Sequence, residues 1–338
     1  MKTTCVSSEQ DCLTVGLGKL QAIRFIFDEL CNDKEWKVSV HDFLNKSENA
    51  TRWMIYSDYC LDDENKSNDV MSFVLMPYLD EEKYQEIDCT IKDLQPSDIK
   101  KVRTVNSEFL MYLKSLPILS FNFIVDNRKL LFGDTGDERL KTVLDFLGLI
   151  NNQFETWIKN ASKAHPLDYY KSSVKKISDC IRELSERKNC KLMQDIILIA
   201  FLGTLYSSKI LQELPSNIEI VGWFPDRDKS NNAYDNIIMD IFNVLFYNQI
   251  PDCNIKFAFS GSETAIVPFY DNENRIVDYI CGTLADYNLD EDFVTKDKFS
   301  IVLQRFFADN SSCHIYRIKS QEDPLKIGRI VLKSHLEE

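Results

Sequence analysis

Three aspartates occupy positions where an α/β sheet places functional groups. Asp58 lies late in a strand-like run, Asp226 directly follows the buried-type run "IEIVGWF", and Asp278 lies in the first turn of a predicted helix. Ligands of open α/β sheets bind beyond the carboxyl ends of the strands. Carboxylates that converge from two strands and a helix would hold one or two divalent cations, Mg²⁺ or Mn²⁺, because these ions favour oxygen ligands. Asp58, Asp226 and Asp278 are therefore the candidate catalytic and metal-binding residues.

Each aspartate also has a purely structural interpretation. Asp58 would accept backbone N–H groups at the end of its strand. Asp226 and Asp228 would begin the helix that follows, and Asp278 would favour the positive end of its own helix. The sequence leaves both interpretations open.

Other catalytic chemistries find little support. The chain has four histidines, and none has a second ligand at a spacing suited to zinc. It contains no P-loop, no Gly-x-Gly-x-x-Gly turn and no Gly-x-Ser-x-Gly elbow. Its ten cysteines are scattered singly, which is typical of reduced and mostly buried thiols.

The pattern of the chain predicts a mixed α/β sheet with helices packed on it. An early pair of strands with a polar turn between them indicates a hairpin, and strand and helix alternate later in the chain. The expected strands are 52–60, 70–79, 119–127, 218–224 and 254–261. The expected helices are 139–149, 154–164, 169–187, 191–214, 232–248 and 275–287.

Three consecutive segments are expected along the chain. Residues 1–50 form an N-terminal helical extension with one amphipathic helix over 17–31. Residues 51–290 form the core. Residues 291–338 form a C-terminal extension in which "CHIYRIKS" and "KIGRIVLKS" predict a small accessory β-hairpin.

Charge and hydropathy restrict the partners. The net charge of -13 argues against a general phosphate-binding surface, so a nucleic-acid partner would need a local basic groove or bound cations. The most basic stretch, 171–191, also contains acidic residues and is typical of a solvated helix face. The longest apolar run, 196–206, is shorter than the roughly 18–20 residues of a membrane span and predicts a buried helix. No apolar secretory segment opens the sequence, which favours a cytoplasmic protein.

Two stretches resemble an uncharacterised ribonuclease H-like family, a domain of unknown function. "WMIYSDYCLDDENKSNDVMSFVLMPYL" resembles its opening strands, the first of which carries Asp-Glu-Ser-Gly. "IEIVGWFPDRD" is similar to its later strand, which ends in an Asp-Arg pair. "FAFSGSETAIVPFYDNENRIVDYICGTLADY" is similar to its closing strand, loop and Ala-Asp-x-x-Ala-Gly helix. The resemblance covers roughly residues 52–288 and implies a ribonuclease H-like fold.

The resemblance assigns Asp58, Asp226 and Asp278 to the three aspartates of the family. The Glu-Ser that follows the first aspartate in the family is Tyr59-Cys60 here, so the carboxylate beside Asp58 is lost. Asp228 or Glu263 would replace it as a metal ligand.

Two functions follow from these observations. The resemblance implies a metal-dependent nuclease associated with mobile elements or phage defence, in which bound metals activate water and stabilise the leaving oxygen. The alternative is a catalytically inert ribonuclease H-like scaffold that binds a protein partner. The altered first motif and the acidic composition favour this alternative.

Overall fold

The computed structural model describes residues 18–47, 50–161, 166–214, 218–250, 255–260, 268–322 and 324–334. The chain divides into two compact units. The helical unit lies within residues 1–26, 127–208 and 229–253, and the sheet unit lies within residues 27–126, 209–228 and 254–338. These interleaved units do not coincide with the expected consecutive division at residues 50 and 290, because the chain passes between the units several times.

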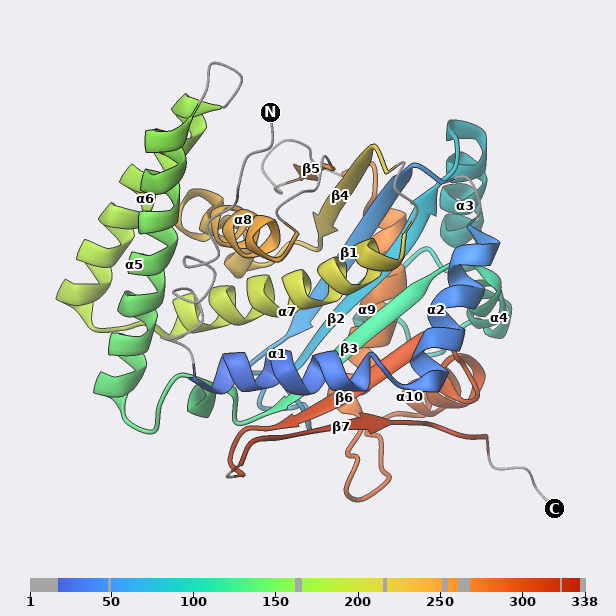
Figure 1. Cartoon of the computed structure of the whole chain (residues 1–338). Helices are drawn as coiled ribbons and strands as arrows, with labels where there is room; N and C mark the ends of the chain where they lie inside the picture. The colour runs from blue at the N-terminus through green and yellow to red at the C-terminus, as the bar shows by residue number, and fades with distance from the viewer. Residues whose placement is uncertain are drawn as a thin grey trace. The chain divides into compact units, whose positions relative to one another are not determined.

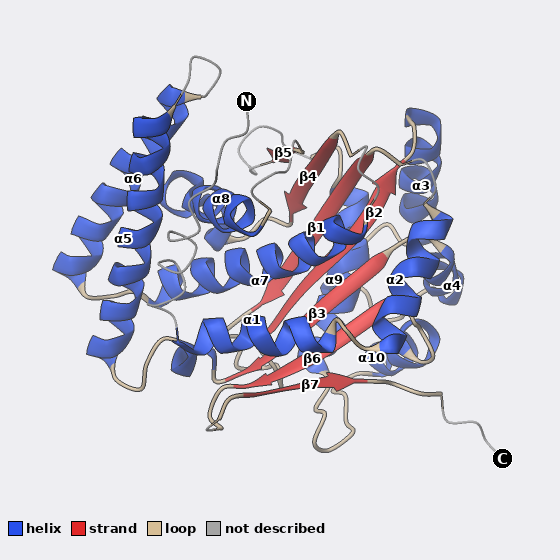
Figure 2. Ribbon diagram, viewed as in Figure 1, coloured by secondary structure: helices blue, strands red, loops and turns tan. Residues whose placement is uncertain are grey.

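The sheet unit contains a seven-stranded mixed sheet with the order β5-β4-β1-β2-β3-β6-β7 (Figure 2). Strands β1, β2 and β3 form an antiparallel meander, β4 and β5 run parallel to β1, β6 is parallel to β3, and β7 is antiparallel to β6. The predicted α/β class, the mixed sheet and the first hairpin are confirmed. The strands are β1 (Arg52–Cys60), β2 (Val70–Tyr78), β3 (Leu119–Asp126), β4 (Ile220–Pro225), β5 (Lys256–Phe259), β6 (Cys313–Lys319) and β7 (Lys326–Ile330).

The central strands are apolar on both faces because both faces of the sheet are covered. Along β1, Trp53 and Ile55 point to one face and Met54 and Tyr56 to the other, and all four are buried. On the face with Met54, helix α9 (Asp271–Asp286) lies against β1 and β2 (Figure 1). Asp58 belongs to this face by the same alternation.

Further helices complete the sheet unit. Three helices contribute buried residues to the same hydrophobic core as α9: α3 (Glu81–Leu94), α4 (Ser107–Ser115) and α10 (Asp297–Val302). On the other face, Phe43 of α2 (Lys34–Lys46) packs against Trp53, with ring centroids 5.6 Å apart. Helices α2, α3, α4 and α10 were not predicted from the sequence.

The C-terminal hairpin belongs to the main sheet and is not a separate accessory element. The two strands β6 and β7 pair as expected, but β6 also pairs in parallel with β3 from Ser120↔Cys313 to Asp126↔Lys319. His314, Tyr316 and Ile318 on β6 are fully buried, so the hairpin is part of the core.

The helical unit contains α5 (Gly136–Asn160), α6 (Leu167–Arg187) and α8 (Lys229–Gln249), which contact one another. A capping box between Thr135 and Glu138 begins α5, which runs on as one helix where two were expected. Helix α8 contains a left-handed turn at Tyr234, Asp235 and Asn236.

Helix α1 (Gly18–Leu30), predicted over 17–31, and helix α7 (Lys191–Glu213) each run from the helical unit into the sheet unit. Helix α7 is long and apolar enough to cross a membrane. Its apolar window is 94% buried in the folded chain, as in the core helix of a soluble protein. The predicted buried helix is thus confirmed.

Helix α9 buries a glutamate completely, and this predicts a pH-dependent stability. Glu273 has 0% exposure, and neither of its carboxylate oxygens meets the geometry of a hydrogen bond with a described residue. Burial raises the pKa of Glu273 from 4.5 to about 7; Asp88 also raises it, while Tyr84 and Arg275 oppose the shift. Between pH 4.5 and 7 the folded protein holds a proton that the unfolded chain has released. Stability therefore falls as pH rises through this window.

We expect Glu273→Gln to remove this loss, because the amide stays neutral at every pH. At pH 8 the variant should gain roughly 1–3 kcal/mol of unfolding free energy over the wild type, and little at pH 4.5. Denaturant unfolding at both pH values measures the difference. Glu186→Gln, at an exposed position on α6, is the matched control. An identical pH dependence in wild type and Glu273→Gln would contradict the expected burial of a neutral carboxyl group.

Candidate acidic site

Two of the predicted site residues lie at the same edge of the sheet. Strands β1 and β4 pair in parallel, and their register ends at Ser57↔Pro225. The N–H of Asp226 then donates to the carbonyl of Ser57 over 2.8 Å. Asp58 and Asp226 therefore follow this last pair at the carboxyl ends of adjacent parallel strands, where α/β sheets place their ligands.

Asp278 reaches the site from the third turn of α9, because this helix begins at Asp271. The expectation that it lies in the first turn is wrong, and the helix dipole does not explain its position. One of its oxygens accepts the N–H of Ile99 over 2.6 Å. Gly282, one turn later, makes this contact possible, since a Cβ there would lie 2.8 Å from a methyl carbon of Ile99.

The three aspartates influence one another electrostatically. Burial raises the pKa of Asp58 well above its usual range, and Asp278 and Asp226 raise it further. Burial also raises the pKa of Asp278 to about 6 and that of Asp226 above its usual value. The positive charge of Lys100 lowers the pKa of all three. Clustered carboxylates that resist ionisation are a common sign of a functional site.

A polar cavity of about 300 Å³ opens beside two of these carboxylates. Asp226 and Asp278 line it, whereas Asp58 is not among its lining residues. The other charged residues of the wall are Asp98, Asp271, Lys100, Lys101, Arg227 and Arg275. The part of the wall that the structure describes thus carries four acidic and four basic side chains. We call this the acidic cavity and its four cations the basic rim.

Asp98 and Lys100 were not predicted from the sequence; they come from the turn that contains η1 (Ile99–Lys101). Lys298 fixes this turn by donating to the carbonyls of Ile99 and Val102 over 2.5 and 2.9 Å. The run "IKKVR" was the local signal for a basic rim. Nothing local indicates that it packs against a helix about 180 residues later.

Asp228 and Glu263 were the two other predicted metal ligands. Asp228 influences the phenol of Tyr59, which points to the opposite face of β1 from Asp58, and it does not line the acidic cavity. Glu263 lies outside the described residues.

The donor set fits Mg²⁺ or Mn²⁺ chemically, although it is not arranged as a ready-made metal site. Among the residues that the structure describes, no three His, Cys, Asp or Glu side chains form a group that could hold an ion. One oxygen of Asp58 accepts the N–H of Tyr59 over 2.8 Å, and one of Asp226 accepts the N–H of Arg227 over 2.7 Å. The carboxylates would have to turn toward an ion to share it.

In the basic stretch on α6, two arginines pair with acidic residues of neighbouring turns. Arg182 pairs with Asp179 over 2.6 Å, and Arg187 pairs with Glu183 over 2.8 Å. These pairs between neighbouring turns agree with the predicted solvated face of mixed charge.

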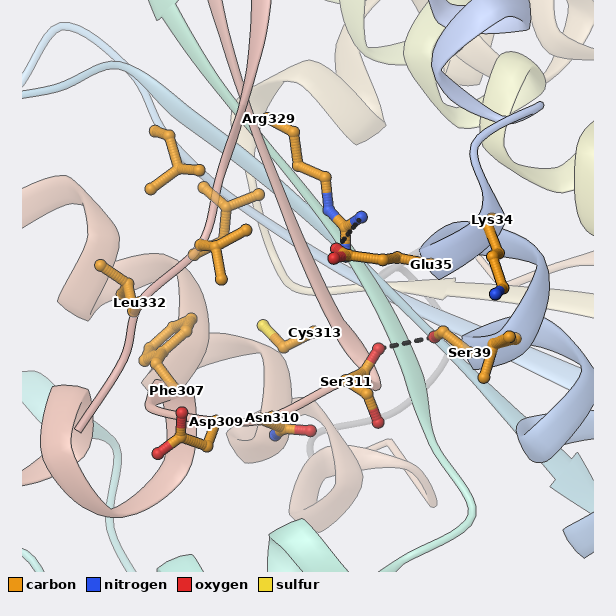
Figure 3. A pocket seen from close by; sticks show the side chains of 14 residues that line it. Lys34, Glu35, Ser39, Phe307, Asp309, Asn310, Ser311, Cys313, Arg329 and Leu332 are labelled. Carbon is orange, nitrogen blue, oxygen red and sulfur yellow. Dashed lines mark hydrogen bonds and ion pairs between the residues drawn. The ribbon is translucent and has the colours of Figure 1, made fainter.

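Another cavity, of about 590 Å³, lies between α2 and the β6–β7 hairpin, and Ser39 lines it (Figure 3). Ser39 also forms a pair with the buried His314. Ser39 Oγ lies 2.9 Å from His314 Nε2, but it also donates to the carbonyl of Ser311 over 2.6 Å. Burial lowers the pKa of His314 to about 3, and no described residue forms a hydrogen bond with its Nδ1. The pair lacks the basicity and the orienting carboxylate of a catalytic triad.

The chain was compared with protein-family models, curated proteins and solved structures, and none of them matches it. The acidic cavity and its basic rim are therefore the features from which a function is inferred.

Proposed function

We propose that this protein is a ribonuclease H-like, divalent-metal-dependent phosphodiesterase that cleaves nucleic acid in the cytoplasm. The observation that carries the proposal is the acidic cavity, where Asp226 and Asp278 stand at the carboxyl edge of two parallel strands and within electrostatic reach of Asp58. The sheet supports it as well, since an antiparallel meander is followed by parallel strands reached through helices.

The basic rim provides local positive charge for a polyanionic substrate that the chain as a whole would repel. The chain carries a net charge of -13, which repels nucleic acid in general. Lys100, Lys101 and Arg227 are exposed around the acidic cavity and would contact phosphate oxygens on either side of the cleaved bond. Binding would then be local and strongly dependent on salt.

Each carboxylate has a separate task in this proposal. Asp58 and Asp226 are fixed by adjacent strands and would hold the ion from one side, and Asp278 would approach it from α9. Mg²⁺ or Mn²⁺ bound there supplies activation of water and stabilisation of the leaving oxygen. Lys100 would orient the phosphate, since it lines the acidic cavity together with Asp226 and Asp278.

The runner-up is an inert ribonuclease H-like scaffold that binds a protein partner. Two observations favour it. The residues after Asp58 are Tyr59 and Cys60 rather than a carboxylate, and each of the three aspartates already accepts a backbone N–H.

A cleavage assay separates the two functions. Purified full-length protein is incubated at low salt with single- and double-stranded DNA and RNA, with Mn²⁺, with Mg²⁺ or with EDTA. We expect cleavage of at least one substrate that depends on the metal and weakens steeply as salt is added. No cleavage of any of the four substrates would favour the scaffold.

A further inference from the structure

A third cavity, of about 670 Å³, lies where β1 and β4 begin, and none of the described residues that line it also lines the acidic cavity. Met54, Ile220 and Gly222 form part of its floor on the sheet. The glycine leaves room for an aromatic wall, because a Cβ at position 222 would lie 2.4 Å from a ring carbon of Phe224. The volume is that of a small-molecule site.

Four aromatic rings form a continuous wall of this cavity. The ring centroids of Tyr78 and Tyr84 are 5.6 Å apart, those of Tyr84 and Phe269 are 6.2 Å apart, and those of Phe269 and Phe224 are 5.5 Å apart. The side chains come from the end of β2, from α3, from the turn before α9 and from β4. Phe269 is 62% exposed, so its ring is accessible to a ligand.

Two carboxylates are fixed among these rings. Glu81 accepts the hydroxyl hydrogen of Tyr78 over 2.7 Å and an amide hydrogen of Gln85 over 2.9 Å, and all three residues line the cavity. Asp88 also lines it and accepts an amide hydrogen of Asn272 over 2.6 Å. The hydrogen bonds hold negative charge in place before any ligand arrives.

The charge of the cavity selects the sign of its ligand. Among the lining residues that the structure describes, Arg52 is the one cation, and it pairs with Glu219 over 3.2 Å, so Glu81 and Asp88 set the charge of this described lining. Aromatic walls that stack nucleobases are accompanied by a positively charged groove that follows the phosphates. This cavity has the opposite charge.

We propose that this aromatic cavity binds an organic cation with an apolar body. The best-matched class is a quaternary ammonium, in which a trialkylammonium group is attached to the rest of the ligand. The negative faces of the rings attract such a cation, and its alkyl groups replace water against the walls. Glu81 and Asp88 add attraction without requiring a directed hydrogen bond, which a quaternary ammonium cannot donate. The proposal is independent of the phosphodiesterase activity.

The test compares two probes of the same shape. Full-length protein is titrated with choline and with 3,3-dimethylbutan-1-ol, in which carbon replaces the charged nitrogen, and binding is followed by ligand-observed NMR. We expect choline to bind about tenfold more tightly. A peptide that carries trimethyl-lysine, beside the same peptide with unmodified lysine, forms a second arm. Binding of choline assigns a free small cation, and binding of the trimethyl-lysine peptide alone assigns a side chain of a protein partner.

Two variants locate the binding in this cavity. Phe269→Ala removes one exposed wall and should weaken choline about tenfold. Glu81→Gln should weaken choline but not its neutral analogue. Phe293→Ala removes a comparably exposed phenylalanine, at 56%, from elsewhere in the sheet unit and should change nothing. Equal binding of the charged and neutral probes, no binding in either arm, or unchanged binding by Phe269→Ala would overturn the proposal.

Discussion

Asp226→Asn is expected to reduce metal-dependent cleavage by about a thousandfold or more. The rigid pairing of β1 with β4 fixes this carboxylate at the edge of the acidic cavity, and asparagine removes its charge while keeping its shape. A metal that polarises phosphate contributes several kcal/mol to the transition state, and each 1.36 kcal/mol is about a factor of ten in rate. Initial rates at saturating Mn²⁺ measure the effect.

Asp93→Asn is the matched control, because Asp93 is an exposed aspartate on α3 outside the acidic cavity. It should cleave at the wild-type rate. Equal rates for Asp226→Asn and Asp93→Asn would place the cleavage elsewhere or in a contaminating enzyme. Circular dichroism of both variants checks that the fold is kept.

The largest expected effect on stability lies in the helical unit. Arg128, at the start of η2 (Arg128–Leu131), donates to Asp195 over 2.7 Å, and the two side chains are only 5% and 4% exposed. Arg128→Met would leave the carboxylate of Asp195 buried without its main counter-charge. Breaking a buried ion pair on one side costs about 3–5 kcal/mol. We expect a loss of that size in denaturant unfolding at pH 7.

The double variant Arg128→Met/Asp195→Leu tests the reason for that loss. Replacing both partners by apolar groups removes the buried charge as well as the pair, so the double variant should be more stable than Arg128→Met alone. A double variant that is less stable than either single one would show that packing, not uncompensated charge, decides stability here.

The strands were predictable because their apolar runs are long and bounded by turn residues. The predicted 52–60 coincides with β1, and 218–224 nearly coincides with β4. The hairpin of β1 and β2 followed from the polar "LDDENKSND" between two apolar runs. The convergence of Asp58 and Asp226 then followed from the rule that functional groups gather at strand ends.

The missed features depend on contacts between distant parts of the chain. Nothing in "CHIYRIKS" indicates that β6 joins β3 rather than forming a separate hairpin. Asp98 enters the acidic cavity only because the turn of η1 packs against Gly282 of α9. The start of α9 was placed four residues late, since its first turn is polar and gives no apolar periodicity. This error moved Asp278 from the third turn to the first.

Calorimetric titration with Mn²⁺ at pH 7.5 tests the shared carboxylate site most directly. We expect one or two ions per chain, bound about tenfold or more weakly by Asp58→Asn and by Asp278→Asn. We also expect weaker binding at pH 5, where Asp278, with a pKa of about 6, is protonated. Binding that is unchanged in both variants, or no binding to the wild type, would contradict a metal site formed by Asp58, Asp226 and Asp278.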